Sequence, residues 1–419
     1  MRDRKKFVMI PAYARIRHPL VLDRLGKLRE LSERTPLNRI EWGKTSVGII
    51  ASGISYQYAK EVMPEASFLK LGMSYPIPER KIRRFASRVR KLLVVEELEP
   101  FLEEQILAMG VHVEGKKYFP RLDEFSPELV EEGLRKAKAL RARKISVPSS
   151  QVPQTASLPR PPVMCPGCPH RSFFFALNQA KGIVLSDIGC YTLSVLPPLE
   201  AIDSCICMGA SISTAHGVAK AVERVQAQEK RPIFAVIGDS TFLHSGVTSL
   251  MDVAYNKGNV KVVILDNRTT GMTGGQDHPG TGRTLQGEET RQVDLPRLVE
   301  SLGIRRVRVV DPYDLKGTTE VIKEEASAAE PSVIITNRPC VMLEKFDPSL
   351  VHKVDPELCE GCGMCLRLGC PAIVPGEVIP SKKQGGKIRR KAEIDPTLCR
   401  GCTVCEQLCK QGAISMAGA

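Results

Sequence analysis

Residues 233–276, IFAVIGDSTFLHSGVTSLMDVAYNKGNVKVVILDNRTTGMTGGQ, carry the pattern that decides the fold. Two short apolar runs, 233–237 and 260–265, flank a segment with a helical pattern. This alternation predicts a βαβ unit of a parallel sheet. Polar residues follow each run, at 238–240 and 266–267, and the carboxyl ends of parallel strands are where such sheets bind ligands.

The polar residues at these two strand ends have the chemistry of a metal–phosphate site. Gly238 lets the backbone approach a phosphate, and the N–H groups at the start of the following helix favour an anion. Asp239 and Asn267 offer hard oxygen ligands, which Mg²⁺ takes when it is shared with phosphates. The sequence therefore predicts a metal–diphosphate site at this edge of the sheet.

Gly238-Asp239-Ser240 followed by Asn267 resembles the thiamine diphosphate signature. The flanks LHSG (243–246) and LDNRTTGMTG (265–274) more narrowly resemble the alpha subunit of the indolepyruvate:ferredoxin oxidoreductases, a family of 2-oxoacid:ferredoxin oxidoreductases. The resemblance implies that thiamine diphosphate and Mg²⁺ are cofactors. It assigns Mg²⁺ to Asp239, Asn267 and the Thr269 carbonyl, and cofactor contacts to Gly238 and Ser240 of the signature. Gly209, at the start of a small-residue helix, is a further candidate for a cofactor contact, although close helix packing would explain it equally well.

The composition indicates several domains and a metal-binding role for the cysteines. A length of 419 residues favours about three domains. The apolar runs are too short to span a membrane, and the N-terminus lacks a signal-peptide pattern, so we expect a cytoplasmic protein. In that compartment the 14 cysteines favour metal over disulfides.

The formal net charge of +13 is partly an effect of counting these thiols as neutral. Three four-iron clusters would lower it to about +7. Basic runs remain at 80–91, 135–144 and 382–391. Without a nucleic-acid-binding motif or interleaved aromatic residues, they favour solvated surface or protein docking over nucleic acid.

Residues 1–143 show an open α/β pattern, and their stretch LKLGMSYPIP (69–78) resembles the transketolase carboxy-terminal-like domain of the same oxidoreductases. We expect no catalytic residues there and interpret Glu96, Glu97 and Glu99 as a solvated loop. Proline-rich residues 144–162 predict an extended linker. The expected strands are 47–53, 67–72 and 91–95, and the expected helices are 55–63, 79–90 and 101–109.

Residues 163–349 form the expected diphosphate-binding domain, completed by strands at 306–310 and 332–335. Its Cys165-x-x-Cys168 pair is compatible with a redox disulfide, half a zinc site or half an iron–sulfur site. The family resemblance favours a proximal four-iron cluster held by Cys165, Cys168, Cys190 and Cys340. A buried thiol at a strand end is the alternative for Cys340, and Cys205 and Cys207 are expected to be small buried residues.

Four histidines of this domain are candidates to bind a 2-oxoacid carboxylate: His170, His216, His244 and His278. Each is individually more often a structural histidine. We favour His170, beside the cluster cysteines, with Arg171 as the alternative anion partner. The glycine-rich segment 271–282 is either a cover for the cofactor or an ordinary loop.

Residues 350–419 repeat a cysteine motif and predict a small α+β domain with two [4Fe-4S] clusters, like a bacterial ferredoxin. Three thiolates at i, i+3 and i+6 bind one cluster, and the fourth comes from the other repeat. Zinc would be expected to use histidine as well, or a different spacing. The predicted sets are Cys359, Cys362, Cys365 and Cys409, and Cys399, Cys402, Cys405 and Cys370, with one extra residue before Cys370.

A thiamine site and three clusters in one chain imply oxidative decarboxylation of a 2-oxoacid with CoA, with electrons leaving one at a time to an external ferredoxin. The family resemblance implies aryl substrates such as indolepyruvate or phenylpyruvate. Other 2-oxoacids (pyruvate, branched-chain or 2-oxoglutarate), an electron-transfer subunit without catalysis, and a non-redox decarboxylase are the alternatives. The basic insert 382–391 is expected to steer an acidic ferredoxin.

The resemblance also implies partner subunits. In this family a second domain binds the pyrimidine ring and supplies an activating Glu, and residues 1–143 resemble the domain that follows it. We therefore expect a separate polypeptide to supply the pyrimidine-binding half, besides the smaller gamma-type or beta subunit of the family.

Overall fold

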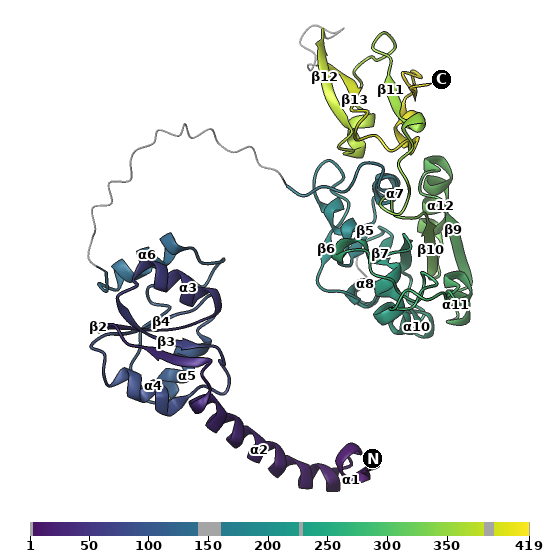
Figure 1. Ribbon diagram of the computed structural model, residues 1–419. Helices are drawn as coiled ribbons and strands as arrows, with labels where there is room; N and C mark the ends of the chain where they lie inside the picture. The colour runs from purple at the N-terminus through teal and green to yellow at the C-terminus, as the bar shows by residue number, and fades with distance from the viewer. Residues whose placement is uncertain (1–2, 141–160, 226–228, 381–388, 419) are drawn as a thin grey trace. The chain divides into compact units, whose positions relative to one another are not determined.

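The computed structural model describes residues 3–140, 161–225, 229–380 and 389–418 (Figure 1). The chain divides into two compact units, residues 1–157 and 158–419. Residues 144–160 of the expected linker and 382–388 of the basic insert lie outside the described residues. The expected diphosphate-binding and cysteine-rich domains belong to one unit, so the boundary between them at 349–350 stays a prediction.

The first unit is built on a four-stranded sheet of order β1-β3-β2-β4. Three strands are parallel, at positions close to the predicted ones. β1 pairs antiparallel with β3, which corrects the expectation of a wholly parallel sheet. Buried Asn38 fixes this edge strand because its side chain accepts the N–H of Met73 at 2.8 Å and donates to the Met73 carbonyl at 3.1 Å. The strands are β1 Asn38–Glu41, β2 Lys44–Ser52, β3 Ala66–Leu71 and β4 Leu92–Val95.

Helices cover both faces of this sheet. The α3–α6 pair packs on one face and the α4–α5 pair on the other. The long helix α2, which the sequence pattern did not predict, is almost wholly exposed. The helices are α1 Arg4–Phe7, α2 Pro11–Arg34, α3 Gly53–Val62, α4 Glu79–Ala86, α5 Phe101–Ala108 and α6 Pro127–Lys136.

Glu96 corrects the interpretation of residues 96–99 as a solvated loop. Its side chain is buried and accepts the N–H groups of Leu102 and Glu103 at the start of α5, at 2.8 and 3.0 Å. Burial raises the pKa of Glu96 above its ordinary value. Glu96 therefore has a structural role at a helix N-terminus.

The second unit contains a six-stranded, wholly parallel sheet of order β6-β5-β7-β8-β10-β9, which confirms the predicted fold class of this region. Buried apolar runs such as β7 suit a sheet that is covered on both faces. The strands are β5 Ile183–Ser186, β6 Ser204–Cys205, β7 Ile233–Gly238, β8 Lys261–Asp266, β9 Arg306–Val310 and β10 Ser332–Asn337.

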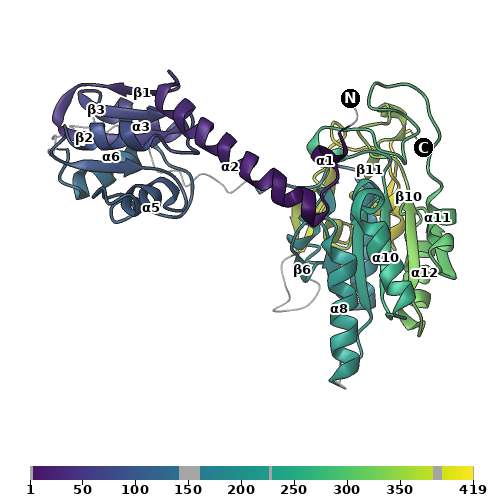
Figure 2. The same ribbon diagram turned by 90° about the horizontal axis from the view of Figure 1, so that it is seen from below.

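A separate hydrophobic core covers each face of this sheet. Helices α8, α10 and α11 pack on one face, and α7 and α12 on the other. Figure 2 shows α8 and α10 side by side. The helices are α7 Pro169–Leu177, α8 Ala210–Arg224, α9 Asp239–Thr241, α10 Val247–Tyr255, α11 Leu295–Ser301 and α12 Leu315–Ser327. The short helical turns are η1 Asn178–Ala180, η2 Cys190–Val195, η3 Phe242–Gly246 and η4 Gly271–Thr273.

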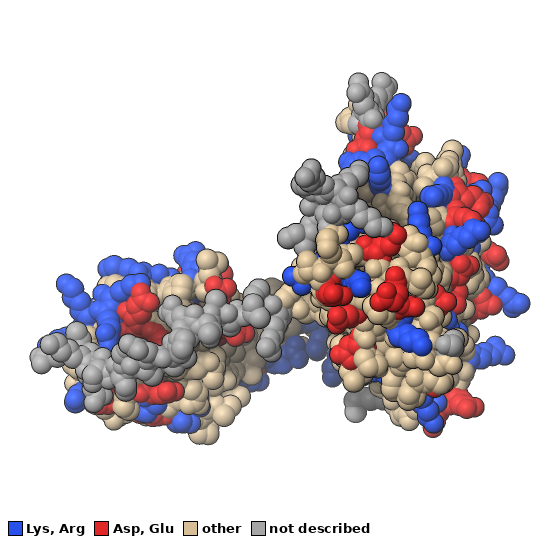
Figure 3. Space-filling model, turned by 90° about the horizontal axis from the view of Figure 1, so that it is seen from above, with Lys and Arg blue, Asp and Glu red and all other residues tan. Residues whose placement is uncertain are grey.

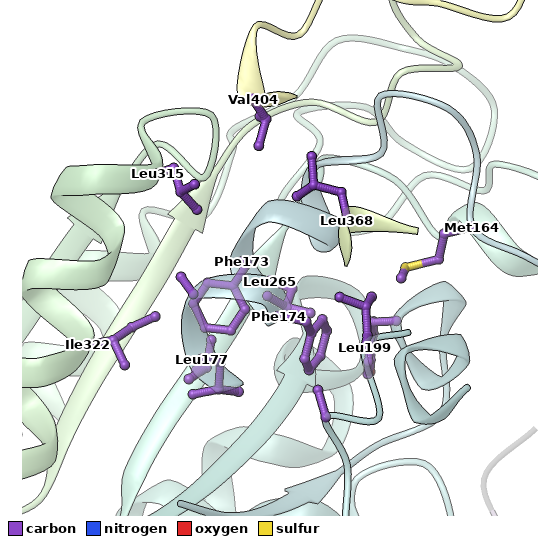
Figure 4. Close-up of a cluster of buried hydrophobic side chains, with 14 of the residues drawn as sticks. Met164, Phe173, Phe174, Leu177, Leu199, Leu265, Leu315, Ile322, Leu368 and Val404 are labelled. Carbon is purple, nitrogen blue, oxygen red and sulfur yellow. The ribbon is translucent and has the colours of Figure 1, made fainter. Parts of the chain in front are cut away.

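The cysteine-rich segment packs on the α7–α12 face of the sheet. Leu368 and Val404 share one hydrophobic core with Phe173 and Leu315 (Figure 4). The segment has two antiparallel strand pairs, β11 with β14 and β12 with β13. Its elements are η5 Pro348–Leu350, β11 His352–Val354, η6 Cys365–Leu368, β12 Ile373–Ile379, β13 Arg389–Ile394, α13 Val404–Leu408 and β14 Ile414–Met416.

The charged surface and the helices are relevant to the expectations for partners and membranes. Lys and Arg side chains are interspersed with Asp and Glu side chains over the face shown in Figure 3. Within the described residues, none of the helices combines the length and the apolar character that crossing a membrane requires.

Candidate functional site

The carboxyl ends of neighbouring strands meet at one pocket in the second unit. β7 and β8 are adjacent and parallel, so Asp239 and Asn267, which follow them, line the same hollow. Both residues are buried. The predicted site residues on its wall are His170, Cys190, Gly238, Asp239, Ser240, Asn267 and Thr269.

Asp239 is held in one orientation by the backbone around it. Its Oδ1 accepts the N–H of Ser240 at 2.8 Å, and its Oδ2 accepts the N–H of Arg268 at 2.9 Å. The Nε2 atom of His278 lies 3.2 Å from Oδ2. Burial and the charge of Asp239 raise the pKa of nearby Asp266 to about 6. A divalent cation would relieve this concentration of carboxylates, so the residues present fit a metal–diphosphate group.

Two functional residues that the sequence analysis missed hold this pocket together. Asp187, after β5, accepts the N–H of Gly209 with both oxygens at 2.7 and 2.8 Å and the hydroxyl of Ser211 at 3.2 Å. The hydroxyl of Tyr191 accepts the N–H of Gly238 at 2.9 Å. Neither residue was recognisable as functional from a spacing pattern in the sequence. The one available signal was that Asp187 follows a short apolar run, which becomes β5.

Gly209 is required by close packing. Its φ is 89°, and an added Cβ would lie 2.2 Å from the Oγ of Ser245. Its N–H points to Asp187, and it is absent from the pocket wall. The structure therefore supports the packing explanation of Gly209 and leaves a cofactor contact as a prediction.

The four predicted proximal cysteines gather beside this pocket. Cys190 lies on its wall, and the N–H of Cys340 donates to the carbonyl of Asn267 at 2.9 Å. Burial raises the pKa of Cys190, and the neighbouring thiols of Cys340 and Cys165 add to that rise. Burial also raises the pKa of Cys168, where Cys165 and Cys340 are again neighbours.

Cys205 and Cys207 differ from the expectation of small buried residues. Both are exposed. They lie at the end of β6, an edge strand of only two residues, and in the turn that leads to α8. Residues at the edge of a sheet have a neighbouring strand on one side only, so they are less covered than residues in its centre. The sequence pattern does not show which strand lies at the edge.

The four candidate histidines differ in their positions relative to the pocket. His170 is buried on the pocket wall, edge-on to Tyr191 with 5.8 Å between ring centroids, and burial lowers its pKa to about 4. His278 is also buried, with its Nε2 atom 3.2 Å from Oδ2 of Asp239, and it does not line the pocket. His216 lies near Asp252 of α10, and His244 is exposed, so neither lines this pocket.

Arg171 does not face the pocket, which corrects its assignment as an anion partner for substrate. Its guanidinium donates to the carbonyls of Met164, Cys165, Leu368 and Gly369. These carbonyls surround it on the side of the cysteine-rich segment. Because α7 presents His170 and Arg171 to different sides, neighbours in sequence belong to different sites.

The cysteine-rich segment forms two hollows that divide its thiols as predicted by spacing. Backbone N–H groups of Ala392, Ala413 and His352 donate to sulfur atoms at 3.2 to 3.4 Å, a type of contact that tunes iron–sulfur clusters. Among the described residues no group of three His, Cys, Asp or Glu side chains is arranged for a single metal ion. One hollow is lined by Cys359, Cys362, Cys365 and Cys409, and the other by Cys370, Cys399, Cys402 and Cys405.

The parallel sheet and its pocket resemble the diphosphate-binding domain of the thiamine enzymes. Residues 187–336 match the family described as thiamine pyrophosphate enzyme, C-terminal TPP binding domain. A 2-oxoglutarate:ferredoxin oxidoreductase from Magnetococcus marinus covers 45% of this chain and 67% of its own at 19% identity, with a TM-score of 0.38 that is too low to define a common fold.

More particularly, most of the chain is similar to the indolepyruvate oxidoreductase subunits IorA. It is 39% identical over 406 residues to the subunit of Thermococcus kodakarensis and 38% identical over 404 residues to that of Pyrococcus horikoshii. These alignments cover 89% and 88% of this chain. The chain spans 62% of the length of either relative.

Proposed function

We propose that this chain is the thiamine-dependent, electron-transferring subunit of an enzyme that oxidatively decarboxylates aryl 2-oxoacids with CoA. One observation carries the proposal: Cys190 lies on the same pocket wall as Asp239. This supports a cluster ligand beside the candidate diphosphate site. The names of the relatives support an indolepyruvate-type substrate.

The residues of the pocket take separate roles in this proposal. Asp239, Asn267 and the Thr269 carbonyl hold Mg²⁺ and the diphosphate, and the N–H of Ser240 fixes Asp239. Bound thiamine diphosphate supplies a nucleophilic carbon for the carbonyl of the 2-oxoacid. His170 is neutral above pH 4 because of burial, so it orients the substrate carboxylate by a hydrogen bond rather than by charge.

The positions of the three cysteine sets suggest the order in which electrons pass from one cluster to the next. Cys168 of the proximal set lines the hollow of the Cys399 set, whereas the Cys359 set has its own hollow. We therefore place the Cys399 set second and the Cys359 set last, with an external ferredoxin as the acceptor. The exposed thiol of Cys362 in the last set is consistent with an exit there.

The proposal includes partner subunits, because the relatives are named as subunits. The smaller gamma-type or beta subunit of the family is one such partner, and a pyrimidine-binding half with its activating Glu completes the thiamine site. The matched family describes the C-terminal TPP-binding domain, which is the diphosphate half of such a site.

The test is anaerobic co-expression of the chain with its partner subunits, followed by assays with indolepyruvate, phenylpyruvate, pyruvate, branched-chain 2-oxoacids and 2-oxoglutarate. CoA and an artificial one-electron acceptor are supplied. Acceptor reduction that requires CoA and favours aryl substrates is the expected result. Iron without bound thiamine diphosphate and without turnover would instead identify an electron-transfer subunit, and turnover that favours another 2-oxoacid would reassign the substrate.

A further inference from the structure

Arg171 lies between two of the cysteine sets. Its guanidinium donates to the carbonyl of Cys165 at 3.1 Å, and the residue lines one hollow with Cys370 and Cys402. The side chain is 6% exposed, and it lines the hollow of the Cys399 set together with Cys168. It therefore occupies the junction between the proximal and the second candidate cluster.

The guanidinium has no carboxylate partner among the described residues. Its hydrogen bonds there go to main-chain carbonyls, including Cys165 at 3.1 Å and Leu368 at 3.4 Å. An arginine stays protonated in proteins, and a buried charge is expensive unless an opposite charge lies close. Iron–sulfur clusters with four thiolates carry net negative charge, so they would supply the missing counter-charge.

We infer that Arg171 is a positioning residue that sets the reduction potentials of the proximal cluster and the second cluster and joins their two segments. This inference rests on the proposed function, because it requires both clusters. Adding an electron to a cluster makes it more negative, and a fixed positive charge nearby favours that state. The four carbonyl contacts bind the 164–165 turn to the 368–369 turn, which holds the two sets in a constant relation.

The experiment compares R171Q, R171K and R400Q in the anaerobically purified complex. Cluster potentials are measured by redox titration followed by electron paramagnetic resonance, and iron is counted. Arg400 lines the same hollow but is exposed, with its guanidinium over the Phe346 ring at 5.0 Å. R400Q thus removes the same charge from a position that water screens.

We expect R171Q to lower the equilibrium constant for reduction of the second cluster at least tenfold, about 59 mV for one electron. R400Q and R171K should stay within about twofold of the native protein. Clusters present with an unchanged potential in R171Q would overturn the inference and leave the proposed function intact. A native complex without clusters would overturn both.

R171K decides the question if R171Q loses its clusters. Lysine retains the charge but cannot reproduce the planar fork of hydrogen bonds. Retained clusters at the native potential support the inference. A tenfold fall despite the retained charge overturns the inference that the charge of Arg171 sets the potential.

Discussion

Replacing Tyr191 with phenylalanine tests how the thiamine pocket is held. The ring and its edge-on contact with His170 remain, so the change removes the hydroxyl that accepts the N–H of Gly238 at 2.9 Å. Burial raises the pKa of Tyr191, so this group is a neutral hydroxyl. Leaving a partly buried N–H without its acceptor costs about 1–3 kcal/mol. Since about 1.4 kcal/mol is a factor of ten, Gly238 should exchange its amide hydrogen roughly 5 to 150 times faster.

Hydrogen exchange followed by mass spectrometry of peptides covering β7 and α9 measures this change locally. Tyr56→Phe is the matched control, because its hydroxyl donates to Glu41 at 2.8 Å in the other unit. It should leave exchange at Gly238 unchanged. Unaltered exchange at Gly238 in Tyr191→Phe would refute the idea that this hydroxyl anchors the turn.

Three further changes test other parts of the chain. Phe174→Ala, in the fully buried core under the cysteine-rich segment, should lower the free energy of unfolding by about 3–5 kcal/mol in urea denaturation, and a loss below about 1 would show that the core refills the space. Cys340→Ala should remove about four iron atoms per chain by iron analysis, whereas unchanged iron excludes it as a ligand. Burial alone would raise the pKa of Glu41, but hydrogen bonds from Arg39, Tyr56 and Lys60 lower it to about 2. The stabilisation that Glu41 gives to the fold is therefore present above pH 4.5 and is lost as the pH falls towards 2. Acid unfolding should therefore be less steep in Glu41→Gln, and equal slopes would contradict the assignment.

The sequence was most informative where chemistry and periodicity coincide. The two apolar runs around Asp239 predicted two parallel strands of one sheet, because strands buried on both faces need continuous apolar residues. The spacing of the cysteines at 359–409 separated two sets, and the structure lines a different hollow with each. In both cases the informative residues are close in sequence.

The sequence was least informative where a single side chain acts across the fold. Tyr191 reaches the end of β7 from a different loop, and Arg171 turns away from its neighbour His170 to bind Gly369. Helix periodicity cannot tell which neighbour each side will meet. β1 was missed because four residues with mixed exposure carry little pattern, although Asn38 fixes that strand from within.

The core in Figure 4 has a consequence for how the protein is made in a cell. Cys365 and Cys405, proposed cluster ligands, belong to the same apolar cluster as Phe173 and Phe174. Under iron starvation, newly made chains would therefore lack part of their interior, and quality-control proteases would meet a loosened molecule. Iron supply would then set how much of the protein survives, as well as how much of it is active.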